Sequence, residues 1–421
     1  MTVTKPMIKG RTKSLIWVAL VAGFFCGNTL AQTNGDPSTE AISKNWPAFR
    51  GPGGLGKAFQ SQAPLTWNQT PGENILWKTR IPKPGFSSPI IWDHYIFLSG
   101  SDEENQVVYC FDTETGNIVW ESQVNDIPGS PAEPPAARET GLAAPTMTTD
   151  GQRVAAIFGS GDLVCLDFEG SRVWAKNIGP PDNHYGHSSS LLSYGDLLMV
   201  QYDHNASQHL LAFLFDTGKL LYDTAREIKI SWASPILIDT GNRTELILSS
   251  NPFVVSYDPQ TGNELWRVEC MAGEVAPSPA YAAGRVFVVN EYARLAAIRI
   301  GNPPALIWES YDDLSEVASP LATEKFIFVP TNFGAMSCLD AESGEKHWVH
   351  DFDHGFYASP ILVGDLVYAL DIKGVMQVFR ASRTFEQVSR SELGEDAMAT
   401  PAFVHGRIYI RGVENLYCIG E

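Results

Sequence analysis

A repeat with a period in the forties is the feature that most constrains the fold of this chain. A small residue, then Ser, Thr or Ala, then Pro recurs eight times, with Ser replacing Pro in the third copy. The copies end at Pro89, Pro145, Ser190, Pro235, Pro279, Pro320, Pro360 and Pro401. Successive copies lie 56, 45, 45, 44, 41, 40 and 41 residues apart. This period is typical of four-stranded blades, and the sequence therefore predicts an all-β, eight-bladed β-propeller.

Each unit contains signals for four antiparallel strands. In the first unit, runs of strand-forming residues are separated by turn residues at Asp93-His94 and by a Thr-Gly turn. The four predicted strands of this unit cover residues 90–92, 95–98, 107–111 and 118–120. No stretch between units has a helical period long enough to form a crossover, which argues against a parallel α/β sheet.

The last unit is one strand short. Only 20 residues follow Pro401, enough for three strands and no Thr-Gly-Trp hairpin. The sequence NILWKT at 74–79 matches NIVWES at 117–122, yet it precedes the first unit. We therefore expect an N-terminal strand to complete the last blade, which closes the ring and removes both open sheet edges.

The segment FDTETGNIVW, 111–120, recurs in several units and each of its marked residues has a structural use. Asp112 can accept backbone N–H groups of the turn, and Gly116 supplies a positive φ. Trp120 presents a large face that can fill the wedge between blades. Sister copies are DPQTGNELW at 258–266 and DAESGEKHW at 340–348.

This repeated Asp-x-x-Thr-Gly-x-x-x-Trp pattern resembles the PQQ-type repeat. That repeat occurs in eight-bladed quinoprotein alcohol dehydrogenases and in the non-catalytic propeller of the outer-membrane-protein assembly machinery. The opening NWPAFRGPGGLG, 45–56, is also similar to the mature start of secreted bacterial PQQ-like propellers. The resemblance covers 46–421 and is specific for fold, but it says little about activity.

For a quinoprotein dehydrogenase, the resemblance would imply a quinone against a Trp, an adjacent-cysteine disulfide, and Ca²⁺ held by carboxylate and amide oxygens. The sequence has no Cys-Cys pair, and no metal triad can be matched to it. We therefore expect no catalytic residues, no metal site and no cofactor, with PQQ and calcium as the alternative. Four of the five cysteines that remain after residue 31 stand where other copies have Ser or Ala, which predicts small buried residues.

The N-terminus resembles an export signal. Basic residues precede the apolar run 15–25, and Thr29-Leu30-Ala31 offers a cleavage site. We expect a signal peptide at 1–31, a flexible linker at 32–45 and the propeller at 46–421, in the periplasm or outside the cell. Lipid attachment at Cys26, association with the envelope and an uncleaved anchor stay open. Cleavage leaves 26 basic against 48 acidic residues, net −22, which disfavours nucleic acid as a partner.

The repeat also predicts which side chains surround the mouth of the central channel. The residues three before each Pro, or before Ser190, are Phe86, Leu142, His187, Trp232, Ala276, Val317, Tyr357 and Met398. Nearby acidic residues are Glu139, Glu274, Glu316, Asp353 and Asp396. The insertion 125–140 is expected to overhang the same face. The loop PPDNHYGHSSS, 180–190, adds His184 and Tyr185, and its two histidines lie in a Pro-rich loop that does not favour a metal site.

Two hypotheses follow if these side chains do more than fill the channel. The first is a non-enzymatic scaffold of the cell envelope, expected to act as a monomer, that holds a protein or peptide partner. The alternative is a quinone-dependent oxidoreductase or small-ligand binder that uses the central channel. The predicted binding residues are Phe86, His184, Tyr185, His187, Trp232 and Tyr357. No transmembrane segment is expected after signal cleavage.

Overall fold

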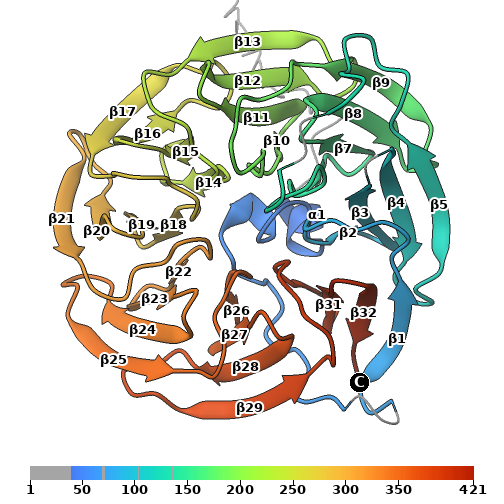
Figure 1. Ribbon diagram of the computed structural model, residues 1–421. Coiled ribbons are helices and arrows are strands. Elements are labelled where there is room, and N and C mark those ends of the chain that lie inside the picture. The colour runs from blue at the N-terminus through green and yellow to red at the C-terminus, as the bar shows by residue number, and fades with distance from the viewer. Residues whose placement is uncertain (1–38, 69–71, 103, 135–136) are drawn as a thin grey trace, which may run out of the picture. The chain divides into compact units, whose positions relative to one another are not determined.

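The computed structural model describes residues 39–68, 72–102, 104–134 and 137–421, which all lie in the compact unit Gly35–Glu421. In these residues, 32 strands form eight four-stranded antiparallel sheets. Figure 1 shows the sheets as blades around a central axis, in chain order. The predicted eight-bladed propeller is confirmed. The predicted signal peptide and residues 32–38 of the predicted linker lie outside the described residues.

The first four blades each use four strands that are consecutive in the chain. Blade 1 has β2 (Ile90–Trp92), β3 (Tyr95–Ser101), β4 (Gln106–Asp112) and β5 (Ile118–Gln123); blade 2 has β6 (Thr148–Thr149), β7 (Arg153–Ile157), β8 (Asp162–Asp167) and β9 (Arg172–Asn177); blade 3 has β10 (Leu192–Tyr194), β11 (Leu197–Asp203), β12 (Gln208–Leu214) and β13 (Leu220–Ala225); blade 4 has β14 (Ile236–Asp239), β15 (Thr244–Ser249), β16 (Phe253–Tyr257) and β17 (Glu264–Glu269).

The last four blades follow the same order, except that the outer strand of blade 8 comes from the N-terminus. Blade 5 has β18 (Ala280–Ala282), β19 (Arg285–Asn290), β20 (Arg294–Arg299) and β21 (Ala305–Ser310); blade 6 has β22 (Leu321–Ala322), β23 (Phe326–Pro330), β24 (Ala335–Asp340) and β25 (Lys346–Asp351); blade 7 has β26 (Ile361–Val363), β27 (Leu366–Leu370), β28 (Val375–Arg380) and β29 (Gln387–Glu392); blade 8 has β30 (Ala402–Val404), β31 (Arg407–Arg411), β32 (Asn415–Ile419) and β1 (Ile75–Arg80).

The hydrophobic core lies between neighbouring blades. The middle strands, such as β4, are buried along nearly their whole length because a blade covers each face, whereas the outer strand β5 alternates between exposed and half-buried residues. Between blades 2 and 3, for example, Ile157 and Leu163 pack in one cluster with Val200 and Phe213. Each blade therefore depends on its neighbours for burial, as expected of a closed repeat protein.

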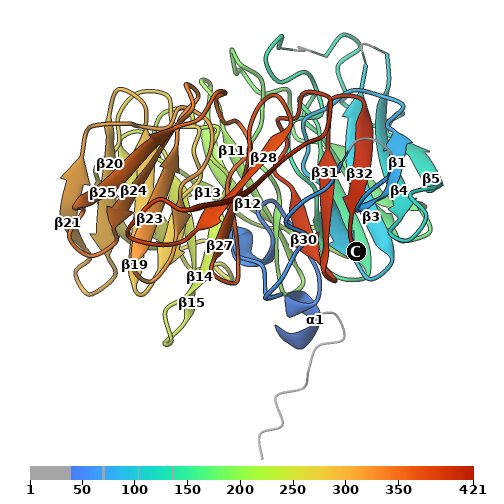
Figure 2. The same ribbon diagram turned by 90° about the horizontal axis from the view of Figure 1, so that it is seen from below.

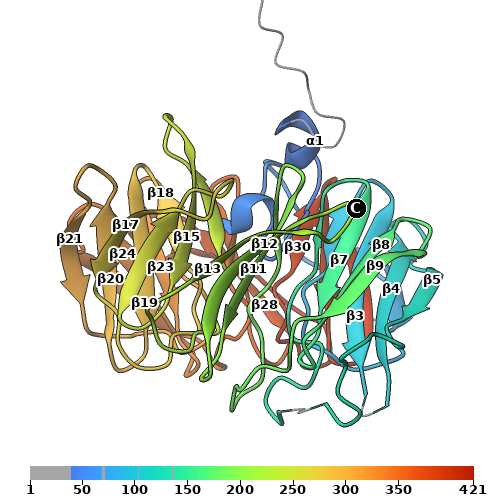
Figure 3. The ribbon, with the colours of Figure 1, turned by 90° about the horizontal axis from the view of Figure 1, so that it is seen from above.

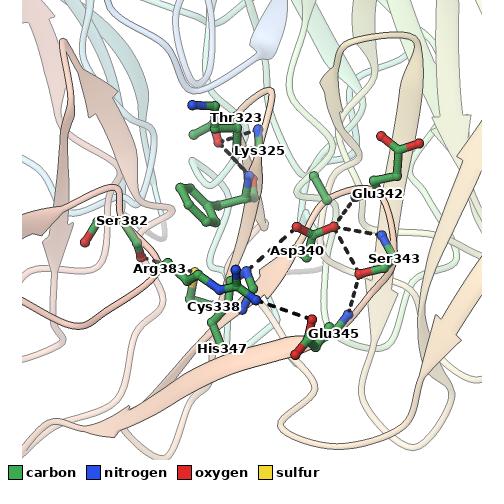
Figure 4. A network of polar contacts seen from close by, with 12 residues as sticks. Thr323, Lys325, Cys338, Asp340, Glu342, Ser343, Glu345, His347, Ser382 and Arg383 are labelled. Atoms are coloured by element: carbon green, nitrogen blue, oxygen red, sulfur yellow. Dashed lines mark hydrogen bonds and ion pairs between the residues drawn. The ribbon is translucent and has the colours of Figure 1, made fainter.

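The Asp turn of the repeat is organised as the sequence predicts. In the blade 6 copy, the carboxylate of Asp340 accepts the backbone N–H groups of Glu342 at 3.0 Å and Ser343 at 2.9 Å (Figure 4). In blade 1, Asp112 accepts the N–H of Thr115 at 2.7 Å. These bonds satisfy the donors of a tight turn and let the chain reverse into the outer strand.

The glycine of the same turn serves a second purpose. Gly116 has φ +69°, and a Cβ placed on it would lie 2.5 Å from the indole of Trp77. The Trp77 Nε1–H donates to the carbonyl oxygen of Thr113 at 3.0 Å. The Trp of one blade therefore packs on the turn glycine of the next, so the predicted wedge is a specific blade-to-blade contact.

The ring closes through β1, as predicted. β1 pairs antiparallel with β32, with Trp77 opposite Cys418, and Figure 1 shows β1 beside β32. Across the seam to blade 1, the buried Arg411 donates to the carbonyl oxygens of Ser87 at 3.1 Å and Ser99 at 2.8 Å. The N-terminal strand thus joins the two ends of the ring through hydrogen bonds and through the Trp–Gly contact.

One mouth of the channel is filled by residues 45–58, here called the N-terminal plug. It contains the short 3₁₀ helix η1 (Pro52–Gly54), and Trp46 pairs with Ile91 of β2. Figure 1 shows this segment near the ring centre, and Figures 2 and 3 show the preceding helix α1 (Thr39–Ser43) outside one face of the ring. Within the expected linker, α1 and the buried Asn45 are therefore part of the folded structure.

Two further expectations concern the cysteines and the membrane. The five cysteines of the described residues are free and buried, which confirms that they act as small core residues: Cys110, Cys165, Cys270, Cys338 and Cys418. Among the described residues, no helix combines the length and the apolar character that crossing a bilayer requires.

Candidate functional site

A ring of hydroxyl groups surrounds the channel where the innermost strands begin. Each blade contributes one Ser or Thr to this ring. From blade 1 to blade 8, the backbone N–H of this residue donates to the hydroxyl oxygen of the equivalent residue in the following blade. From Ser88 to Thr146 and from Ser359 to Thr400, for example, these distances are 2.9 Å. The members of the ring are Ser88, Thr146, Ser190, Ser234, Ser278, Ser319, Ser359 and Thr400.

This ring corrects the register of the sequence prediction in two blades. Thr146 follows Pro145 and Ser190 replaces a proline, yet both occupy the position that Ser88 holds in blade 1. The prediction aligned the prolines, whereas the structure aligns the hydroxyls. The side chains two residues before the hydroxyl ring are Phe86, Ala144, Ser188, Trp232, Ala276, Val317, Tyr357 and Met398, and all eight line one cavity.

The predictions for Leu142 and His187 as members of the mouth ring are therefore wrong. His187 is buried inside blade 3, with its ring centroid 5.1 Å from that of Tyr202. Burial, and to a smaller extent the charge of the neighbouring His204, lowers the pKa of His187 to about 3. A neutral, buried imidazole at this place belongs to the blade core.

The cavity has a volume of about 370 Å³. Of the predicted site residues, Phe86, Tyr185, Trp232 and Tyr357 line it. Its inner end is bounded by the hydroxyl ring and by Phe49 of the plug. The channel is thus a blind cavity with aromatic walls at its mouth, which suits a bound group better than a through passage.

A cluster of three rings forms one side of the mouth. The centroids of Tyr185 and Trp232 are 5.4 Å apart, and His184 lies 4.3 Å from Tyr185 and 5.2 Å from Trp232. Trp232 Nε1–H donates to the carbonyl oxygen of Gly186 at 3.0 Å, which fixes the orientation of the indole. His184 therefore supports the lining aromatics from outside the cavity.

The predicted overhang of the insertion 125–140 is confirmed for its described end. Glu139 and Thr140 line the cavity, and the Thr140 hydroxyl donates to the carbonyl oxygen of Tyr185 at 2.6 Å. A Cβ on Gly186 would lie 2.0 Å from the Thr140 Oγ1, so a glycine is needed where the two loops meet. The insertion and the loop 180–190 thus form one continuous wall.

Three of the five predicted acidic residues line the cavity: Glu139, Glu274 and Glu316. The other two are not among its lining residues, and Asp396 pairs with Lys373 at 3.0 Å. The charge of Glu274 is the main reason that the pKa of Tyr185 is raised, with burial and the other two glutamates acting in the same direction. The mouth therefore has a negative potential.

A second depression on the same face was not predicted. Its volume is about 510 Å³, and Tyr292, Tyr311 and Phe333 line it with exposed fractions of 93%, 60% and 76%. Tyr292 has φ +57° in the turn between β19 and β20. Such turn residues carry no periodic signal, so sequence patterns gave no reason to select them. We call this depression the aromatic groove.

One hydrogen bond links the rim of the cavity to the rim of the aromatic groove. Glu316 lines the cavity, and its carboxylate accepts a hydrogen bond from the side-chain amide of Asn332. Asn332 lies between Thr331 and Phe333, which both line the groove. A chain lying on this face would pass from one depression to the other across the Glu316–Asn332 pair.

The lining does not fit the quinone that the sequence resemblance implied. Trp232 offers an aromatic face, but PQQ is an anion with carboxylate groups, and the described lining holds three glutamates and no Lys or Arg. No group of three His, Cys, Asp or Glu suited to a metal ion occurs among the described residues. The five described cysteines are free, so they form no disulfide beside the cavity.

Several solved structures resemble this fold. BamB from Moraxella catarrhalis is 14% identical with a TM-score of 0.61, covering 82% of this chain and 97% of its own. The quinohemoprotein alcohol dehydrogenase from Comamonas testosteroni is 12% identical with a TM-score of 0.69, covering 91% and 82%. A europium-containing methanol dehydrogenase is 10% identical with a TM-score of 0.68, covering 89% and 91%. At these identities the likeness establishes the fold alone.

No curated protein sequence matches the chain significantly. The family model described as outer membrane protein assembly factor BamB matches residues 61–200, 213–313 and 302–410. These segments cover most of the eight blades and more than half of the chain. The protein therefore belongs to the family of the outer membrane protein assembly factor BamB.

Proposed function

We propose that this protein is a non-enzymatic binding scaffold of the cell envelope that holds an extended segment of a protein partner. The observation that carries the proposal is that a hydrogen bond joins Glu316, which lines the cavity, to Asn332, whose neighbours Thr331 and Phe333 line the aromatic groove. One side chain of the segment occupies the cavity, and the residues beside it lie in the groove. A rigid propeller presents both depressions without rearrangement.

The aromatic groove favours a peptide over a small ligand. Tyr292 and Phe333 expose most of their side chains, although large aromatic groups are usually buried or placed at interfaces. Exposed aromatic side chains on a rigid surface are the residue types that dominate binding free energies at protein interfaces. A small ligand in the cavity would leave this second depression unused.

The family and the N-terminal sequence support a location in the cell envelope. BamB is an outer membrane protein assembly factor by name, and the first residues of this chain resemble an export signal. A scaffold that acts on segments of envelope proteins agrees with both. Fractionation of cells expressing the tagged chain should recover the protein outside the cytoplasm.

Selection of short random peptides displayed on phage against the purified protein tests the proposal. Peptides that bind should lose at least about tenfold in affinity with Tyr357→Ala or Phe333→Ala, because each is a partly exposed aromatic side chain of the expected contact. Phe59→Ala is the matched control: Phe59 is 65% exposed and lines neither depression. Absence of any binding peptide, or equal losses in the three variants, would refute the scaffold.

The redox alternative is tested separately. Adding PQQ with calcium and following thermal unfolding would reveal binding, since a ligand at 100 times its Kd adds about 2.7 kcal/mol to the free energy of unfolding. We expect no shift, because the cavity presents carboxylates to an anionic cofactor. A saturable shift that Trp232→Phe weakens would support the alternative over the scaffold.

A further inference from the structure

The carboxylates at the cavity mouth have no Lys or Arg partner. Glu274 contacts Nε2 of His184 at 3.0 Å, and Glu316 accepts from the neutral amide of Asn332. Among the described residues, none of the three lining glutamates forms an ion pair with Lys or Arg. Elsewhere on the surface, carboxylates such as Glu309 are paired with arginine.

Aromatic faces complement these carboxylates. Tyr185, Trp232 and Tyr357 contribute to the lining, and the Trp232 N–H is already bonded to Gly186. The indole therefore offers its ring rather than its donor to a bound group. A Lys ammonium or an Arg guanidinium within about 6 Å of an aromatic centroid gains roughly 0.5–2 kcal/mol, more when water is excluded.

The depth of the cavity suits a long side chain with a charged end. Ala276, Val317 and Met398 provide an apolar wall for a methylene stem. The hydroxyl oxygens of Ser234 and Ser278, for example, each accept one backbone N–H, which leaves a second lone pair for another donor. Arg50, a buried cation of the plug, donates through its two terminal nitrogens to the carbonyl oxygens of Pro279 and Pro320 in the blades.

The pKa values of Tyr185 and Tyr357 are shifted in the direction that a negative potential at the cavity mouth produces. The pKa of Tyr185 is raised above its usual value, with the charge of Glu274 as the largest cause. The pKa of Tyr357 is raised by burial first and by Glu316 second. Negative potential opposes the loss of a phenolic proton, and the same potential attracts a cation.

We infer that the cavity binds a positively charged side chain, Lys or Arg, of the segment that the scaffold holds. This inference rests on the proposed function, because it specifies the residue that enters the cavity. The lining aromatics hold the cation by their faces, and Glu139, Glu274 and Glu316 supply the opposite charge. The flanking residues of the segment lie in the aromatic groove.

Peptides selected from the unbiased phage library provide the probe. We expect Lys or Arg at one position of every cavity-binding peptide, and replacing that residue by norleucine should weaken binding at least about tenfold. The double variant Glu274→Gln, Glu316→Gln should bind the charged peptide as weakly as the norleucine peptide. Added salt should weaken binding to the wild type and have little effect on this variant.

The matched control removes two charges from the opposite face. Glu169 and Glu342 are exposed in the turns before the outer strands of blades 2 and 6, so Glu169→Gln with Glu342→Gln changes the net charge equally. This control should leave affinity within about twofold, because exposed charges more than a Debye length away are largely screened.

The outcomes separate this inference from the proposed function. Peptides that need Tyr357 and Phe333 but show no Lys or Arg preference would overturn the cationic ligand and leave the scaffold intact. Equal affinity of the charged and norleucine peptides would likewise overturn the cationic ligand and leave the scaffold intact. A library that yields no binding peptide would refute both.

Discussion

Ser190 belongs to the hydroxyl ring although its copy of the repeat has no proline. Six copies of the repeat have a hydroxyl directly before proline, and in these copies the proline and the hydroxyl identify the same register. At Thr146 and Ser190 they disagree, and the hydrogen bonds follow the hydroxyl. The sequence therefore predicted the mouth residues of six blades correctly and placed His187 wrongly, although the hydroxyl alignment was visible in the residues themselves.

The burial of His187 predicts a pH dependence of stability. Its pKa is lowered to about 3 in the folded state from an ordinary 6.5, so only the unfolded state takes up a proton between these values. The free energy of unfolding should fall as the pH drops from about 6.5 towards 3, by up to about 1.4 kcal/mol per pH unit from this group. Urea titrations of the wild type and His187→Phe between these limits would measure the difference in slope. Equal slopes would contradict the burial of a neutral histidine.

At the scale of elements, the hairpin turn of each blade is also part of the next interface. The sequence predicted the Asp and Gly roles within the turn, because both follow from local backbone chemistry. It did not predict that the turn glycine receives a Trp ring from the preceding blade, because that contact joins residues from different units. Gly218 shows the same arrangement, where a Cβ would lie 2.5 Å from the indole of Trp174.

Two glycine variants separate the backbone cost from the packing cost. Gly116 and Gly284 have φ +69° and +73°, but a Cβ on Gly284 meets nothing within 4 Å. Gly284→Ala should cost about 1 kcal/mol for its backbone alone. Gly116→Ala should cost at least about 2–3 kcal/mol, because it also displaces Trp77. Chemical denaturation measures both, and equal losses would show that the Trp contact contributes nothing.

At the scale of the whole molecule, closure by β1 gives every blade a neighbour on both sides. The sequence predicted this strand because its copy of the motif precedes the first unit. The hydrogen bonds of Arg411 to blade 1 were not predictable, since a basic residue inside a strand pattern gives no indication of its partner. With the seam formed, the eight blades have no terminal interface, and unfolding requires one interface to open first.

Loss of the seam contact should lower the stability of the ring and open it first at β1. Trp77→Ala removes a large, mostly covered side chain and the hydrogen bond to Thr113, and should cost about 3–5 kcal/mol. Leu76→Ala, on the same strand with 43% of its side chain exposed, should cost about 1 kcal/mol and serves as the control. Thermal unfolding should show a much larger fall in midpoint for Trp77→Ala than for Leu76→Ala, and hydrogen exchange should locate the opening at β1. Uniform loss of protection in both variants would contradict a local seam.

The N-terminal plug also sets the order in which the molecule can be completed. Arg50 bonds to Pro279 and Pro320, which lie 229 and 270 residues further along the chain, and Gln60 bonds to Gly406. During synthesis these residues leave the ribosome well before their partners, which belong to blades 5, 6 and 8. Contacts of such long sequence separation slow folding. The N-terminal plug therefore lacks these partners until the later blades have been synthesised. Because Phe49 forms the inner end of the cavity, a chain interrupted before its last blades has no finished receptor for a partner.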